Sequence, residues 1–264
     1  MKQNTNTSTQ QKPQNFTRPY PNPAVEKTPP ESQSLNPKDL DILQMVLEMG
    51  YLNMVQITKK FFGLPSMVTE KAAGYTVRKL IRMELLKTKD AELSDNTLLM
   101  VTPKARELLG EKHTDKKLPE PLKSIFQPRV NHDLLLNDLR IRFEELGFLN
   151  KWVSEKMMEE IPFFKRLFQD LPDAVCKKRN GKGYFLELEV SMKSPKVYAE
   201  RVREYLKILE LEEIKDAEIE GVVFFCTDEK VKDKIKEQIP EGVKNISVLM
   251  YSNYFQRPEV KNEN

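Results

Sequence analysis

Carboxylate side chains alternate along one apolar segment of the chain, and a further aspartate lies upstream of it. Glu187 and Glu189 belong to the run 184–190, and Asp173 follows a proline before that run. A strand repeats every two residues, so Glu187, Glu189 and Ser191 share one face. Buried carboxylates need counter-charges or a cation, and oxygen ligands of this kind suit Mg²⁺ or Mn²⁺. Asp173, Glu187 and Glu189 are therefore candidate metal ligands.

A tight turn brings these acids together in the predicted fold. Asn180-Gly181 is a strong hairpin signal, and it separates a short strand over 171–176 from the strand over 184–190. Pairing of the two strands moves Asp173 towards Glu189, so that their carboxylates converge. The alternative interpretation is an exposed strand face that carries charge.

Further elements are needed to position this hairpin. A helix begins at Asn131 and ends at Gly147, with Leu135, Leu139 and Phe143 on its apolar stripe. Downstream, the pattern predicts a strand over 151–154, a helix over 155–168 broken by Pro162, a helix over 195–209, a strand over 222–227, a helix over 229–239 and a strand over 246–251. This succession predicts one mixed sheet flanked by helices.

The first half of the chain predicts a helical domain with a small sheet. Asn36 is a suitable N-cap, Pro37 fits the first helical turn and Gly50 ends the helix. A second helix runs from a cap at Asn53 to residue 61, and a third covers 68–83. Two strands follow over 85–89 and 98–101, with a turn at 94–96 between them. Thr102 then caps a last helix that extends through residue 109. This order over residues 36–110 resembles a winged helix-turn-helix domain.

The third predicted helix would then lie in the major groove of DNA. Its inward positions are Val77, Leu80 and Ile81. The outward positions that we expect to contact DNA are Lys71, Tyr75, Arg78, Lys79 and Arg82, together with Lys87 and Lys89 in the wing. A protein-interaction role is the alternative for such a domain.

Two resemblances follow from these motifs. Pro172-Asp173, then Glu189 near the end of the next strand, then a helix, resembles the core of PD-(D/E)XK nucleases. More narrowly, the chain is similar to the replication-relaxation family over about residues 36–227. The motifs that carry this similarity are the winged helix, His132-Asp133-Leu134, Pro172-Asp173-Ala174, Glu187-Leu188-Glu189-Val190 and the helix with Arg201 and Tyr205.

The nuclease resemblance implies a catalytic set and also shows a departure from it. In that family the acids bind Mg²⁺ or Mn²⁺, and a lysine two residues after the glutamate positions or activates the attacking water. Ser191 stands at that position here. Lys193 would share the face of the acids if the strand extends that far, and Lys196 in the first turn of the next helix could swing in; the alternative is that either is an ordinary surface lysine. His132 matches a recurrent histidine of the replication-relaxation family, in a catalytic or a structural role. The candidate catalytic residues are Asp173, Glu189, Lys193, Lys196 and His132.

Composition excludes several other classes of protein. The 264 residues are 31% charged and 39% hydrophobic, and they contain no apolar stretch that could span a membrane and no apolar signal-peptide core. Cys176 and Cys226 lie in apolar segments, which favours two buried free thiols over a disulfide in a protein that we expect to be cytoplasmic. No P-loop or GxGxxG motif occurs. Residues 1–131 carry 20 basic and 14 acidic residues, against 23 and 26 in 132–264, which favours a polyanion partner for the first half.

These observations predict an α/β (α+β) protein with a disordered arm (1–34), a winged helix (36–110), a linker (111–130), a nuclease-like domain (131–256) and a tail (257–264). The resemblance implies a DNA-binding accessory factor or regulator in the replication or mobilisation of plasmids or mobile elements, with a degraded nuclease domain. The alternative is a metal-dependent DNA endonuclease or nickase. DNA is the expected partner, Mg²⁺ or Mn²⁺ is expected only in an active nuclease, and no membrane contact is expected. The sequence leaves open a homodimer and contacts with replication or mobilisation proteins.

Overall fold

The computed structural model describes residues 34–92, 97–112 and 117–255. Most of the predicted arm, the wing turn at 94–96 and the predicted tail lie outside these residues. The described residues from Leu35 onwards belong to one unit of mutually contacting segments. In the described segments, no helix combines the length and the apolar character that a membrane crossing needs.

Three helices open the chain, and their N-termini follow from capping residues. They are α1 (Pro37–Met49), α2 (Met54–Phe62) and α3 (Met67–Arg82). The side chains of Asn36, Asn53 and Ser66 each accept a hydrogen bond from a backbone N–H in the first turn of the helix that follows. The predicted caps Asn36 and Asn53 are confirmed, and Gly50 ends α1 with a φ of 88°.

A small antiparallel sheet and a fourth helix follow. The elements are β2 (Leu86–Asp90), β3 (Thr97–Val101) and α4 (Pro103–Lys112). β3 also pairs with β1 (Leu52–Asn53), which gives the order β1-β3-β2. The two residues of β1 are too few to produce an alternating pattern, so the sequence did not predict this strand.

A five-stranded mixed sheet forms the second half, as the sequence predicts. Its strands are β4 (Leu149–Ser154), β5 (Ala174–Lys178), β6 (Gly183–Glu189), β7 (Ile219–Cys226) and β8 (Ile246–Met250), in the order β4-β5-β6-β7-β8. β4, β5 and β6 pair antiparallel, whereas β6, β7 and β8 pair parallel. β6, which carries the two glutamates, is the central strand. The fold is α+β.

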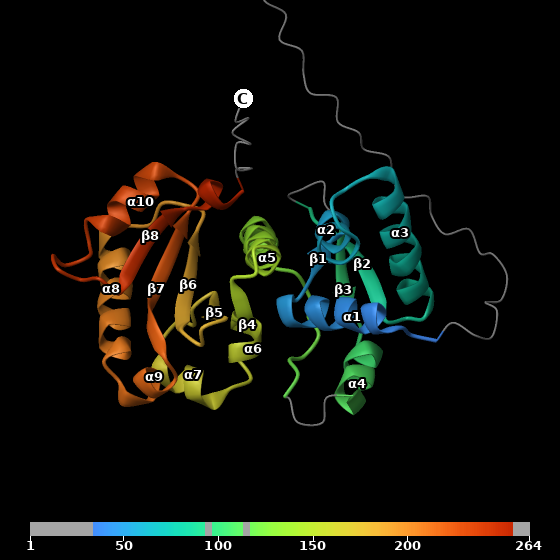
Figure 1. The fold of residues 1–264 in the computed structure, drawn as a ribbon, viewed down its shortest axis with the longest axis horizontal. Coiled ribbons are helices and arrows are strands. Elements are labelled where there is room, and N and C mark those ends of the chain that lie inside the picture. The colour runs from blue at the N-terminus through green and yellow to red at the C-terminus, as the bar shows by residue number, and fades with distance from the viewer. Residues whose placement is uncertain (1–33, 93–96, 113–116, 256–264) are drawn as a thin grey trace, which may run out of the picture. The chain divides into compact units, whose positions relative to one another are not determined.

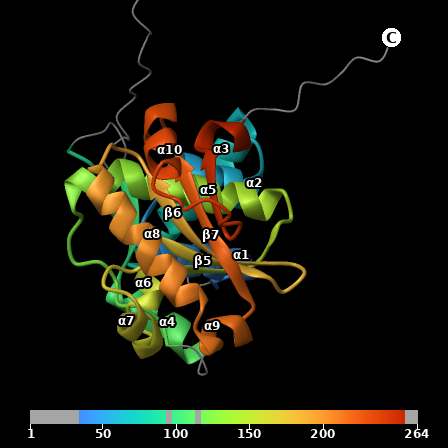
Figure 2. The ribbon, with the colours of Figure 1, turned by 90° about the vertical axis from the view of Figure 1, so that its left-hand side faces the viewer.

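Helices cover both faces of this sheet (Figures 1 and 2). α5 (Val130–Glu145) packs on one face, where Leu139 joins Leu186 and Leu188 in a cluster that also includes residues of α1. α8 (Pro195–Leu209) and α10 (Glu229–Lys236) pack on the other face with Phe185 and Phe224. The smaller elements are α6 (Glu155–Met158), α7 (Pro162–Leu167), α9 (Glu212–Asp216) and the 3₁₀ helices η1 (Gln127–Arg129) and η2 (Tyr251–Tyr254).

α5 also contacts the N-terminal helices through polar side chains. Asn137 Nδ2 donates to the carbonyl of Tyr51 at 2.9 Å, and Gln56 Nε2 donates to the carbonyl of Leu134 at 2.8 Å. The hydroxyl of Tyr51 donates to Asp133 Oδ2 at 2.8 Å. α5 therefore connects the sheet with the small N-terminal sheet region.

Candidate functional site

Asp173 lies just before β5 and is held by backbone and side-chain donors. Its Oδ2 accepts the N–H of Leu188 at 2.7 Å and lies 3.2 Å from Nε2 of His132, while Oδ1 lies 3.4 Å from Nη2 of Arg129. Burial acts to raise the pKa of Asp173, but His132, the Leu188 amide and Arg129 outweigh burial and hold that pKa below its ordinary value. Asp173 is therefore an ionised carboxylate whose charge is already compensated.

His132, on the first turn of α5, is the central partner of this aspartate. Its Nδ1 lies 3.1 Å from Asp133 Oδ1, and its Nε2 lies 3.1 Å from the carbonyl of Leu188. Burial acts to lower the pKa of His132, yet the hydrogen bonds and charges of Asp133 and Asp173 raise it to about 10. A histidine that is protonated at neutral pH cannot accept a proton from an attacking water. For His132 the sequence left open a catalytic or a structural role, and this geometry favours the structural role.

Glu187 and Glu189 point to one face of β6, as the two-residue period predicts, and both are buried. Glu187 Oε1 accepts hydrogen bonds from Nε of Arg201 at 2.8 Å, from Nη2 of Arg201 and from the hydroxyl of Tyr205. Burial raises the pKa of Glu187 to about 7, against the opposing charge of Arg201. The alternative interpretation, in which Glu187 and Glu189 lie on an exposed strand face, is wrong because α8 covers these acids.

Glu189 has a partner of its own. Nζ of Lys193, in the loop between β6 and α8, lies 2.9 Å from Glu189 Oε1. Burial raises the pKa of Glu189, although Lys193 opposes the shift. The sequence placed Lys193 on the face of the acids only if the strand extended that far. β6 ends at Glu189, and Lys193 instead reaches that glutamate from the loop. Lys196 does not join them: its side chain is 82% exposed and its ammonium lies 3.9 Å from Glu200.

Each of the three candidate metal ligands is thus paired with different basic side chains. Asp173 is bound by His132 and Arg129, while Glu187 is bound by Arg201 and Glu189 by Lys193. In the described parts of the chain, no three His, Cys, Asp or Glu side chains are grouped to hold a metal ion. Because each carboxylate already has a cation beside it, the donor set does not fit a divalent cation.

The second candidate surface is the exposed side of α3 and of β2, where the sequence analysis predicts contacts with DNA. Lys71, Tyr75, Arg78 and Arg82 are exposed on α3, as are Lys87 and Lys89 on β2. Lys79 is not: it is buried, and its Nζ lies 2.5 Å from Asp39 Oδ2 on α1. The prediction of Lys79 as an outward residue is wrong, because a buried carboxylate on the neighbouring helix provides its partner.

Sequence reasoning missed two features of these sites. Arg129 contacts Asp133, Glu155 and Asp173, although it belongs to the segment predicted as a linker. Its four-residue spacing from Asp133 was the one sequence feature that indicated an ion pair.

The second feature is a set of exposed apolar side chains around the start of α3. They are Leu64, Met67 and Val68, each more than 70% exposed.

The two buried thiols are confirmed as free. Cys176 and Cys226 are both buried and form no disulfide. Burial raises the pKa of Cys176 to about 11 and that of Cys226 to about 12. Both thiols are therefore protonated at neutral pH and lack the thiolate character of a nucleophile.

Comparison with protein families places this chain in a known family. The family model described as replication-relaxation matches residues 43–222, which is more than half of the chain. The matched region runs from α1 to the first half of β7 and so contains α3, β2, β3, His132 and all three candidate acids. No curated protein matches the chain.

Proposed function

Because the chain belongs to the replication-relaxation family, whose description connects it with replication, we propose that it is a DNA-binding accessory factor or regulator in the replication or mobilisation of a plasmid or mobile element. The N-terminal helices and wing would bind duplex DNA as a winged helix-turn-helix. The five-stranded domain would be a nuclease-like scaffold that no longer cleaves DNA.

The exposed basic side of α3 is the observation that carries DNA binding. α3 follows a short turn after α2 and leads directly into the hairpin of β2 and β3, which is the order of a helix-turn-helix with a wing. Lys71, Arg78 and Arg82 are exposed along it. Lysine and arginine side chains bind the phosphates of both strands and fix the protein on the duplex.

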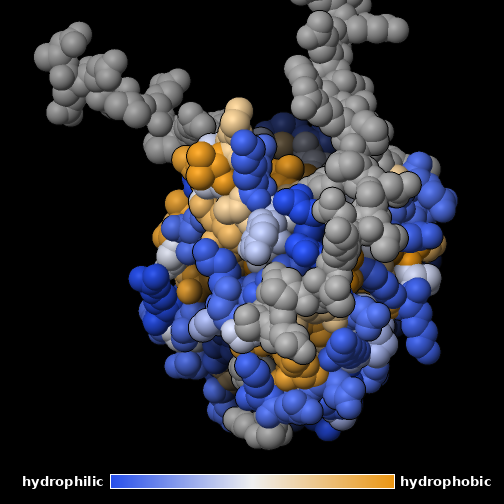
Figure 3. Space-filling view, turned by 90° about the vertical axis from the view of Figure 1, so that its right-hand side faces the viewer, coloured by the Kyte–Doolittle hydropathy of each residue, from blue (hydrophilic) through white to orange (hydrophobic). Residues whose placement is uncertain are grey.

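The start of α3 adds side chains that suit base contacts. Met67 and Val68 are 72% and 77% exposed, one turn before Lys71. Apolar side chains in the major groove contact the methyl group of thymine. Figure 3 shows the side of the molecule on which α3 lies in Figure 1, and hydrophobic patches are visible there among hydrophilic side chains. Basic side chains beside apolar ones suit the major groove of DNA, where phosphates lie along the edges and thymine methyl groups lie on the floor.

A salt titration tests the DNA-binding proposal. Substitution of Lys71, Arg78 and Arg82 by glutamine should weaken binding to a mixed-sequence duplex and reduce the slope of log K against log salt by about 0.9 for each phosphate that is no longer neutralised. The matched control is the triple substitution Lys207→Gln, Lys230→Gln and Lys236→Gln, which removes three exposed charges from α8 and its neighbour α10. Equal binding by the α3 variant and the parent would refute the assignment.

The charge balance around the acids supports the scaffold role of the sheet domain. A PD-(D/E)XK nuclease needs carboxylates that are free to bind a cation. Here Arg201 binds Glu187, protonated His132 binds Asp173, and the residue two after Glu189 is Ser191 instead of lysine. Because an internal base occupies the place of the cation at each carboxylate, a divalent ion would gain little by binding there.

The metal-dependent endonuclease or nickase remains the second candidate because of one contact. The ammonium of Lys193 lies 2.9 Å from Glu189, and the Lys193 side chain is 49% exposed. A lysine beside the motif glutamate is what the nuclease family requires, although Lys193 reaches that position from the following loop. Release of Lys193 into solvent would leave Glu189 free.

Melting scans across Mg²⁺ and Mn²⁺ concentrations separate the two candidates. A ligand that binds only the native state raises stability by RT ln(1 + [L]/Kd), about 2.7 kcal/mol at a hundredfold excess over Kd. We expect a flat titration and intact supercoiled plasmid after incubation with either metal. A rise in melting temperature that Asp173→Asn abolishes, with nicked or linear plasmid as product, would instead establish the nuclease.

A further inference from the structure

The β5–β6 hairpin is strongly basic, and its charge has no part in the proposals above. The segment 177–182 reads Lys-Lys-Arg-Asn-Gly-Lys, with no acidic residue. Lys178, Arg179 and Lys182 are exposed or partly exposed, and Lys151 on the neighbouring strand β4 is exposed beside them. In Figure 2 the two gold strands of this hairpin extend away from the rest of the ribbon.

Four of these bases lack a carboxylate partner. Lys151, Lys177, Lys178 and Arg179 form no ion pair in the described parts of the chain. Lys182 differs, because its ammonium lies 2.5 Å from Glu220. We use the name "hairpin bases" for Lys151, Lys177, Lys178 and Arg179.

The register of the sheet makes this arrangement unfavourable for the protein alone. Lys151 and Lys177 are directly paired across β4 and β5, so their side chains lie on the same face of the sheet. Like charges that lie directly opposite in an antiparallel pair are destabilising. Lys178 follows on the opposite face, where its ammonium lies 4.2 Å from the centre of the Tyr184 ring. Positive charge therefore surrounds the end of the hairpin.

The nearby acids compensate this charge only in part: Lys182, together with Lys178, lowers the pKa of Glu220. Glu220 is bound by Lys182 and by the hydroxyl of Tyr184 at 2.7 Å, while Glu218 lies beside Gly181 at the tip. The hairpin bases thus outnumber the acidic side chains that lie close to them. A polyanion would remove the repulsion between Lys151 and Lys177.

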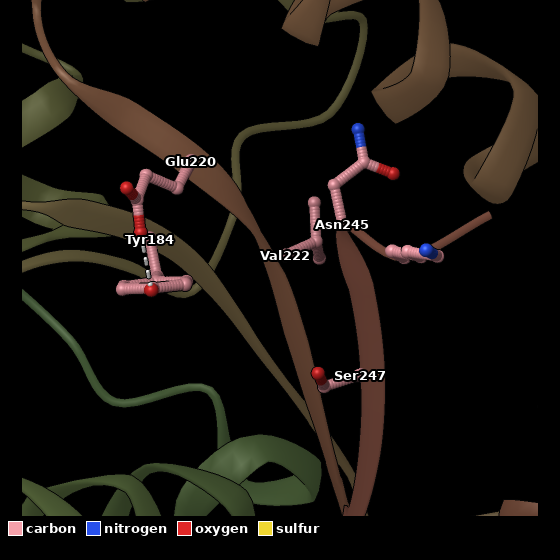
Figure 4. Close-up of a pocket in the computed structure, with 6 residues that line it drawn as sticks. Tyr184, Glu220, Val222, Asn245 and Ser247 are labelled. Carbon is pink, nitrogen blue, oxygen red and sulfur yellow. Dashed lines mark hydrogen bonds between the residues drawn. The ribbon is translucent and has the colours of Figure 1, made fainter.

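A pocket at the base of the hairpin continues this surface. Glu220 and Tyr184 point towards each other at one side of it, and Asn245 and Ser247 lie on β8 and the segment before it (Figure 4). The residues that line it are Tyr184, Glu220, Val222, Lys244, Asn245 and Ser247. Ammonium, amide and hydroxyl groups are the side-chain donors that contact phosphate and sugar oxygens in DNA complexes.

We propose that the β5–β6 hairpin is a second DNA-binding element, which holds the phosphate backbone of duplex DNA through the hairpin bases. A two-stranded β-ribbon fits the major groove, and lysine and arginine on its two faces reach the phosphates on either side. The contact is electrostatic and does not depend on sequence. This inference rests on the proposed DNA-binding function, but it uses residues distinct from those of α3.

Fluorescence anisotropy with a labelled mixed-sequence duplex tests the hairpin in the intact chain. The hairpin variant carries Lys177→Gln, Lys178→Gln and Arg179→Gln, and it is compared with the α3 variant and with the triple control on α8 and α10. We expect the hairpin variant to bind more weakly than the control at low salt, with a salt slope reduced by about two to three. Removal of the Lys151–Lys177 repulsion should leave its melting temperature equal to that of the parent or slightly higher.

Each outcome separates the two proposals. If the α3 variant loses affinity and the hairpin variant binds like the control, the hairpin inference is wrong and the proposed function stands. If only the hairpin variant loses affinity, the hairpin binds DNA and the assignment of α3 is wrong. If the parent protein binds no duplex at low salt, both proposals are wrong.

Discussion

The guanidinium of Arg201 on α8 donates through both Nε and Nη2 to a single oxygen of Glu187 on β6. The two side chains are only 14% and 10% exposed, so this ion pair lies within the domain. Tyr205, one turn after Arg201, donates its hydroxyl to the same oxygen. The helix that follows the acidic strand thus provides both the base and the hydroxyl that compensate the buried charge of Glu187.

Removal of Arg201 should therefore be more damaging than removal of the charge on Glu187. Arg201→Leu leaves a buried carboxylate without its base, and the loss of one partner from a buried pair costs about 3–5 kcal/mol. Glu187→Gln keeps an acceptor for Tyr205 and removes a buried charge, so its cost should be smaller. Urea unfolding of both variants checks this order. Equal stability of Arg201→Leu and the parent would show that the pair does not hold the domain together.

Lys79 should behave as a structural residue although it lies on the proposed DNA-binding helix. Lys79→Met removes the ammonium from Asp39, which is 1% exposed. We expect a loss of about 3 kcal/mol in the free energy of unfolding and an unchanged salt slope of DNA binding below the melting temperature. Arg78→Met, one residue earlier and exposed, should give the opposite pattern. A reduced salt slope for Lys79→Met at full folding would contradict this distinction.

The sequence predicted the elements better than it predicted the partners of individual side chains. Caps, glycine stops and apolar periodicity are local, so α1, α2, α8 and the hairpin were located within a few residues. The orientation of Lys79 and the bases opposite Glu187 and Asp173 depend on contacts between distant segments. Lys79 meets Asp39 across 40 residues, and Arg129 meets Asp173 across 44. The spacing of residues along a strand or helix carries no information on such pairs.

Lys156 on α6 should make stability increase with pH. Burial lowers the pKa of Lys156 to about 8, against the charges of Glu159 and Glu120, and its Nζ is buried without a hydrogen-bond partner in the described residues. The unfolded chain binds this proton up to about pH 10.4, so the group destabilises the native state below pH 8 and ceases to do so above pH 10. Lys156→Met should raise the melting temperature most at neutral pH.

Melting scans of Lys156→Met and the parent between neutral and alkaline pH check this expectation. The difference between the two melting temperatures should decrease as pH rises through about 8 and vanish near pH 10. Lys207→Met on the exposed side of α8 serves as the control and should show no such trend. A constant difference across the range would show that Lys156→Met acts by packing alone.

His132 should have the opposite dependence, because its pKa is raised. Asp133 and Asp173 outweigh burial and raise the pKa of His132 to about 10, so the native state retains a proton that the unfolded chain releases near pH 6.5. The stabilisation is therefore complete below about pH 6.5 and is lost as pH rises towards 10. His132→Asn keeps a donor near Asp173 but cannot be protonated. The parent should melt well above His132→Asn at pH 6, and the difference between the two melting temperatures should decrease progressively and vanish by about pH 10.

Chemical-shift titration of the His132 ring in the parent gives an independent measurement of its pKa. A midpoint near 6.5 would show that the imidazole is not part of the charged network around Asp173.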